Sequence, residues 1–264
     1  MAYARTDFDG RAETEPRIRR IGITDLNEAV KRGIDDLIAM PTFAAFVVVI
    51  YPVIGLLLMG LTFGYELLPL MFPVIAGFPL IAPFAAIGLY ELSRRREHNL
   101  PISWDMLQDF SAHRLASLIT LGLVLVAIFA AWIAAATLLY SAVFGTWTPD
   151  SIGAFVHAVF NTEPGWILIA AGCGIGLLFA AMAFSVSVVS FPLLLDRDVG
   201  VLTAIRTSMR AVAANPAVMT AWALFIALAL ALASLPFFIG LIVVLPVLGH
   251  ATWHLYRRVV EPVD

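Results

Sequence analysis

The sequence predicts an all-α, polytopic membrane protein with six transmembrane helices. Three observations predict this class. Apolar residues make up 61% of the 264-residue chain and charged residues only 13%, whereas soluble domains have about 45–50% apolar and about 25% charged residues. The mean hydropathy is +0.93, and the apolar residues form runs that reach the roughly 20 residues needed for a helix to cross a bilayer. Every lysine and arginine lies outside these runs.

The six spans follow from the positions of these runs. They are predicted at Thr42–Leu61, Leu67–Leu89, Leu115–Val143, Gly165–Leu195, Val218–Leu235 and Pro236–Leu255. The last two runs are nearly continuous, and Pro236 is the natural break because proline starts helices but does not easily continue them. The alternative is five spans with one long bent helix. We favour six, because about 38 residues are too many for one crossing.

The distribution of charge predicts the orientation of these spans. All 16 basic residues fall before the first span, between the second and third, between the fourth and fifth, or in the tail. The opposite side carries only Glu66, Asp150 and Glu163. Lysine and arginine gather on the cytoplasmic side of membrane proteins, so both termini are expected in the cytoplasm and the chain in a bacterial inner membrane. The chain then divides into a cytoplasmic segment (1–40) with an amphipathic helix, a six-span domain (41–256) and a cytoplasmic tail (257–264).

A sequence repeat precedes two of the outward-going spans. Ala29–Pro41 and Ala204–Pro216 each run twelve positions from alanine to proline, with apolar, basic and small residues in matching places. A weaker middle copy lies at Ile102–Arg114. We therefore expect three parallel units, each an interfacial amphipathic helix followed by a transmembrane hairpin. These helices either cover the cytoplasmic ends of the bundle or form a collar that docks a partner or senses lipid.

Few residues of this sequence could carry charge within the membrane or bind a metal ion. The predicted spans contain no Asp, Glu, Lys or Arg in their interiors, although such residues mark most ion and proton pathways in membranes. His250 and His254 are four residues apart and share a helix face, a spacing that can hold a metal ion. No cysteine or carboxylate ligand accompanies them in the sequence, so they are weak candidates. We expect no cofactor and no catalytic residue. The net charge of −3 gives no indication of nucleic-acid binding.

Glycines in the fourth predicted span and prolines in the second are candidates for helix packing and for a break in the helix. Gly172 and Gly176 form a small-xxx-small pair that permits close helix packing, either inside the bundle or against another subunit. Pro73, Pro79 and Pro83 interrupt the second span. They predict either a bent packing helix or a hinge that lines a cavity.

Several motifs resemble those of an uncharacterised family of bacterial integral membrane proteins, domain of unknown function 2189. They are Ile23–Leu26, Pro41, Tyr90–Arg96, Trp104–Asp105, Ser190–Asp196 and Ala204–Pro216. Some members of that family are labelled as cytochrome c oxidase subunits. Because the mid-membrane histidines of a catalytic oxidase subunit are missing here, the resemblance implies at most an accessory or assembly role.

These observations favour a non-enzymatic accessory, scaffold or assembly protein. Its expected partners are the lipid bilayer and other membrane subunits, of which a respiratory oxidase is one candidate, or further copies of itself. The alternative is a transporter or lipid-handling protein for an uncharged or amphipathic substrate, with the second span lining the path. A membrane enzyme would require a polar cluster that converges on His250–His254 or on His113.

Overall fold

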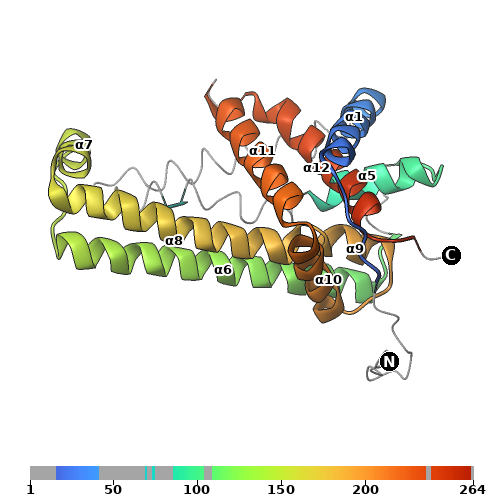
Figure 1. Ribbon diagram of the computed structural model, residues 1–264, viewed down its shortest axis with the longest axis horizontal. Coiled ribbons are helices and arrows are strands. Elements are labelled where there is room, and N and C mark those ends of the chain that lie inside the picture. The colour runs from blue at the N-terminus through green and yellow to red at the C-terminus, as the bar shows by residue number, and fades with distance from the viewer. Residues whose placement is uncertain are drawn as a thin grey trace.

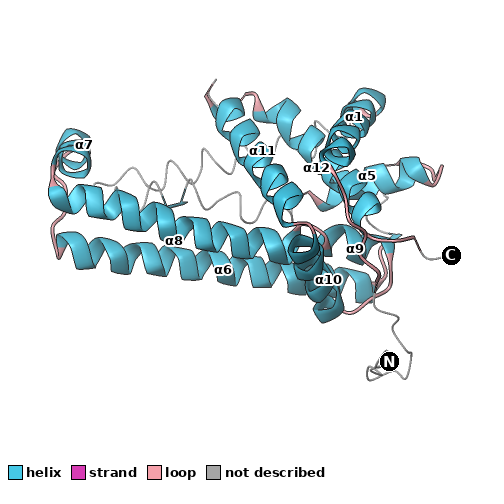
Figure 2. Cartoon of the chain, in the orientation of Figure 1, coloured by secondary structure: helices cyan, strands magenta, loops and turns pink. Residues whose placement is uncertain are grey.

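The computed structural model describes residues 16–41, 69, 73–74, 86–103, 109–235 and 239–262. The regular elements in these ranges are helices, apart from one isolated β-bridge between Ile18 and Val260 (Figure 2). The predicted all-α class is therefore confirmed for the described residues. The helices are α1 (Ile23–Ala39), α5 (Ile87–Glu97), α6 (Ala112–Phe144), α7 (Ile152–Asn161), α8 (Glu163–Ser187), α9 (Ser190–Asp196), α10 (Val201–Ala214), α11 (Pro216–Ser234) and α12 (Leu241–Val259).

Three stretches among these helices are long and apolar enough to cross a membrane: Ala112–Phe144, Glu163–Asp196 and Pro216–Ser234. They contain the third and fourth predicted spans and nearly all of the fifth. The sixth predicted span corresponds mostly to α12, which does not meet the same standard, because its second half carries two histidines and two arginines. The first predicted span and most of the second lie outside the described residues. The six-span count therefore stays a prediction.

A long antiparallel pair, α6 and α8, forms one end of the molecule, with α7 across its tip (Figure 1). The pair packs closely where Gly176 of α8 meets Trp132 of α6, since a Cβ on Gly176 would lie 3.0 Å from the indole ring. The outward faces of both helices are apolar. Leu138, Leu177 and Leu178 are each at least 70% exposed, a surface suited to lipid or to another membrane protein.

The opposite end of the molecule is a packed layer, here called the end layer, made of α1, α5, α9, α10 and residues 246–259 of α12 (Figure 1). Its largest fully buried side chains include Trp253, Tyr256 and Phe191. The two terminal segments meet at this layer. The Arg19 amide donates to the Val259 carbonyl at 2.7 Å, and the Glu261 amide donates to the Arg17 carbonyl at 3.0 Å.

The two clearest copies of the predicted repeat lie on α1 and α10, and both helices end in the same backbone geometry. The residue before each proline has nearly identical dihedral angles: φ −134° and ψ 48° at Met40, and φ −131° and ψ 50° at Asn215. The buried positions also match. Ala29, Gly33 and Asp36 are buried in α1, and their counterparts in the register of the repeat, Ala204, Ser208 and Ala211, are buried in α10. Both segments therefore form a helix that buries one face and then turns at a proline.

Small residues let α12 lie close to its two neighbours. A Cβ on Gly33 of α1 would lie 2.8 Å from the Ala251 amide nitrogen, and a Cβ on Gly249 would lie 2.5 Å from the Leu89 side chain of α5. Glycine removes the side chain that would separate the helix axes. The second half of α12 is thereby held between α1 and α5, and the polar residues of the three helices are brought together.

Candidate functional site

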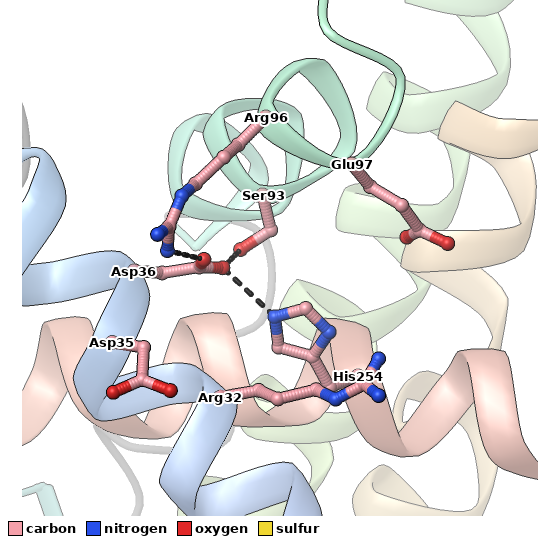
Figure 3. A pocket seen from close by; sticks show the side chains of 7 residues that line it. All are labelled: Arg32, Asp35, Asp36, Ser93, Arg96, Glu97 and His254. Carbon is pink, nitrogen blue, oxygen red and sulfur yellow. Dashed lines mark hydrogen bonds and ion pairs between the residues drawn. The ribbon is translucent and has the colours of Figure 1, made fainter.

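The carboxylate of Asp36 is the centre of a buried polar cluster between α1, α5 and α12 (Figure 3). Only 4% of this residue is exposed. Its Oδ2 atom accepts hydrogen bonds from Ser93 Oγ at 2.6 Å and from His254 Nε2 at 2.8 Å. Its Oδ1 atom accepts from Arg96 at 2.5 Å. One carboxylate thus links three helices.

Helical spacing explains why these donors converge. Ser93 and Arg96 are three residues apart on α5, and His250 and His254 are four apart on α12, so each pair projects from one helix face. The close approach of the helices at Gly33 and Gly249 sets the distance between these faces.

The hydrogen bonds fix the protons of the cluster. Burial alone would raise the pKa of Asp36, but hydrogen bonds from His254, Ser93 and Arg96 and the charge of His254 hold the pKa below its ordinary value of 3.8. An ionised carboxylate only accepts, so Ser93 donates to Asp36. His250 Nδ1 lies 2.7 Å from Ser93 Oγ and must then donate to it. The other ring nitrogen of His250, Nε2, is buried without a hydrogen-bond partner in the described part of the chain.

This arrangement differs from a serine hydrolase triad. In a triad, the histidine stands between the serine and the acid, and the acid orients the histidine. Here Asp36 binds Ser93 directly, and Ser93 is fully buried with its hydroxyl engaged by both neighbours. The serine is therefore a structural link rather than an exposed nucleophile.

The predicted histidine pair lies within this cluster. Each histidine uses the ring nitrogen that faces the cluster for a hydrogen bond. His250 Nδ1 binds Ser93, and His254 Nε2 binds Asp36. Over the ranges that the structure describes, no group of three or more His, Cys, Asp and Glu side chains is arranged to hold a metal ion. His113 lies elsewhere, exposed and 3.8 Å from Asp198.

A pocket of about 290 Å³ opens beside the cluster. It is lined by Arg32, Asp35, Asp36, Ser93, Arg96, Glu97 and His254 (Figure 3). All seven lining residues are polar or charged and come from the same three helices, while carbon atoms of their side chains form the larger part of the exposed lining. It is a surface that can recognise a charged group.

Further ion pairs surround the cluster and tie the end layer together. Glu91 is fully buried and binds Arg94 and Arg95, each at 2.7 Å. Glu97 accepts from the Trp253 indole at 2.9 Å and from Arg257, also at 2.9 Å. These contacts place most of the charge that follows the second predicted span inside the folded layer.

The other predicted site residues lie away from this cluster. Gly172 and Gly176 face α6, with Gly172 in ordinary contact with Leu139 and Gly176 against Trp132. The Trp132 indole donates to the Pro73 carbonyl at 2.8 Å, which satisfies one backbone acceptor of the second predicted span. Pro79 and Pro83 lie outside the described residues.

Sequence reasoning identified the two histidines but missed Asp36, Ser93 and Arg96. A signal for Asp36 was present in the repeat. In its register Asp36 occupies the place of Ala211, so an acid stands where the other copy buries an apolar side chain. No local pattern marked Ser93 or Arg96, because their partner lies nearly sixty residues away in the sequence.

The apolar spans and the packed end layer are features of an integral membrane protein with helical spans. Residues 71–196, just under half of the chain, match the family described as predicted integral membrane protein (DUF2189). The resemblance drawn from the motifs is therefore confirmed over this range. No curated protein and no solved structure matches the chain.

Proposed function

We propose that the protein crosses a bacterial inner membrane six times, with both termini in the cytoplasm. The pairing of the terminal segments supports this topology. Segments that hydrogen-bond to one another, as Arg19 does with Val259 and Glu261 with Arg17, must lie on one side of the membrane. This pairing supports an even number of crossings between them.

We base six crossings rather than four on the order of the helices, although α12 is not among the three stretches that are long and apolar enough to span a membrane. Both α1 and α5 pack on α12 in the end layer, which fits two crossings by the spans predicted between them, Thr42–Leu61 and Leu67–Leu89. α11 starts in the layer, where Asn215 binds the Ile21 amide. Its far end meets the start of α12, since a Cβ on Gly240 would lie 2.7 Å from the Ala233 carbonyl. α12 then returns to the layer.

For this topology, the decisive test is cysteine accessibility in intact cells. After Cys173→Ala, a cysteine placed at Asp150 is expected to react with an impermeant maleimide added outside, and one placed at Glu261 only after the cells are opened. Labelling of the Asp150 position only from the cytoplasmic side would overturn the topology.

The role we propose is that of a non-enzymatic accessory, scaffold or assembly subunit of a membrane complex, with a respiratory oxidase as one candidate. One observation carries this proposal. The buried charged groups of the end layer are engaged in holding helices together, while the α6–α8 pair leaves long apolar faces uncovered by the described residues. Function is then expected at surfaces.

A photo-crosslinking scan of these faces tests the role. A photoreactive amino acid would replace exposed leucines one at a time, at Leu138 on α6, Leu177 and Leu178 on α8 and Leu228 on α11. A subunit role predicts discrete protein adducts that cluster on one contiguous face. Lipid adducts alone at all four positions, with a monomer in several mild detergents, would contradict it.

The alternative role is a transporter or lipid-handling protein for an uncharged or amphipathic substrate. The polar pocket in the end layer favours lipid handling. A transport path past Pro73, Pro79 and Pro83 would need water at mid-membrane depth. The bond from Trp132 to Pro73 instead supports a packed wall at that point.

A further inference from the structure

We propose that the pocket between α1, α5 and α12 binds the phosphoethanolamine headgroup of a membrane lipid, with the phosphate near Arg32 and the ammonium near Asp35. The pocket holds about 290 Å³, and its floor consists of side chains at least nine-tenths buried: Asp36, Ser93 and His254. Packing of three helices thus forms the site. The inference goes beyond the accessory role, which does not depend on it.

Some charged side chains of the pocket are held in partly buried ion pairs, whereas others are not. Asp36 is paired with Arg96, and Glu97 is paired with Arg257 and Trp253. Among the residues that the structure describes, Arg32 pairs with Glu28 alone, at 3.1 Å and in an exposed position, the kind of contact that contributes little to stability. Asp35 is exposed and makes no hydrogen bond or ion pair within the part of the chain that the structure describes. One cation and one anion therefore remain to bind a ligand.

His254 adds a further polar atom. Its Nε2 atom is held by Asp36, and the second ring nitrogen is turned away from Asp36 (Figure 3). The same view shows Arg32 extending toward the His254 side of the pocket and Asp35 lying away from it on α1. Opposite charges at two ends, with the His254 ring at the Arg32 end, match a ligand that carries both charges.

The pocket lies at headgroup depth in the proposed topology. Asp35 precedes Pro41 by six residues, about 9 Å along a helix at 1.5 Å per residue, and the first predicted span begins directly after this proline. Ile34 and Ile38 border Asp35 on α1, and Ile38 is 71% exposed. These side chains offer an apolar surface to acyl chains beside a polar pocket, as interfacial helices do.

The charge pattern distinguishes this lipid from others. A headgroup with a phosphate and no amine, such as phosphoglycerol, would place no cation near Asp35 and would be repelled by it. A choline headgroup carries a quaternary ammonium that has no N–H to donate. Phosphatidylethanolamine is therefore expected to bind about threefold more tightly than phosphatidylglycerol, the difference that one exposed ion pair makes.

Lipid titration of the purified full-length protein, followed by native mass spectrometry, tests the proposal. The probes are palmitoyl-oleoyl phosphatidylethanolamine, phosphatidylglycerol and phosphatidylcholine, together with soluble phosphoethanolamine. Asp35→Asn is expected to weaken phosphatidylethanolamine binding about threefold and to remove its advantage over phosphatidylcholine. Arg32→Gln should weaken the binding of all three lipids. The control is Glu28→Gln, which removes the same surface pair without altering the pocket lining and should leave binding unchanged.

Four results would overturn the proposal. They are equal or tighter binding of phosphatidylglycerol, unchanged lipid affinity in Asp35→Asn, an equal effect of Glu28→Gln and Arg32→Gln, and equally tight binding of soluble phosphoethanolamine, which would assign the pocket to a soluble ligand. Because Asp35 and Arg32 are exposed and Glu28 is only half-buried, the variants should fold. Matched thermal unfolding curves establish this before binding is compared.

Discussion

Replacing Asp36 by alanine is the most informative perturbation of the end layer. The substitution removes one carboxylate and leaves three donors without their acceptor: Ser93, His254 and Arg96. Asp35→Asn is the matched control, because the neighbouring acid on the same helix is exposed and makes none of these bonds.

The expected magnitude follows from the burial of each donor. Removing one partner of a buried ion pair costs about 3–5 kcal/mol when both partners are buried. Here the Arg96 side chain is 41% exposed and can be rehydrated, which lowers the cost. Ser93 and His254 are buried and cannot recover their bonds with water. We expect a loss of about 2–4 kcal/mol for Asp36→Ala and less than about 0.5 kcal/mol for Asp35→Asn.

Thermal unfolding in detergent measures the difference. At about 2–4 °C per kcal/mol for a chain of this size, Asp36→Ala should lower Tm by roughly 4–16 °C. Tryptophan fluorescence, to which the buried Trp253 contributes with the five other tryptophans, reports on tertiary packing, and circular dichroism reports on total helix. A Tm for Asp36→Ala within about 1 °C of the parent protein would refute the stabilising role of this cluster.

Three further substitutions test single contacts, two on α1 and one on α6. Folding lowers the pKa of Asp36, so the stability that its carboxylate contributes is present above the unfolded pKa and is lost as the pH falls through the folded pKa. Asp36→Asn should therefore flatten the dependence of unfolding free energy on pH below about pH 4. An unchanged slope of that dependence would contradict this prediction. Gly33→Ala should destabilise the protein by about 1–3 kcal/mol despite the better helix propensity of alanine, since the new Cβ would lie 2.8 Å from the α12 backbone. The control is Gly174→Ala, whose Cβ would enter open space and which should not lower Tm. Trp132→Phe removes the donor to Pro73 and should cost about 1 kcal/mol in unfolding free energy, and no measurable change in Tm would argue against that bond.

Local patterns in the sequence predicted the helical class and much of its layout. The third and fifth predicted spans agree closely with α6 and α11, because apolar run length alone decides where a helix can cross a bilayer. The repeat predicted two similar helices, and α1 and α10 end in the same geometry at Met40 and Asn215. Proline and amphipathic spacing are local signals that a single sequence carries.

The candidate site could be predicted only in part, since its contacts are long-range. The spacing of His250 and His254 predicted their shared face, but their acid lies over two hundred residues earlier, on α1. Four-residue spacing cannot reveal a partner on another helix. Likewise, the polar second half of α12 was counted as part of a span, whereas its packing against α1 and α5 places it within the end layer.

The packing of α1 on α12 has a consequence for how the protein is made. Roughly two hundred residues separate these helices, so at about 5–20 residues per second α1 is complete roughly 10–40 s before its partner. During that interval Asp36 lacks His254, and α1 can only rest on the membrane surface by its apolar side. The last helix to be synthesised therefore completes the contacts of the first, and a chain that stops before α12 would leave the site open.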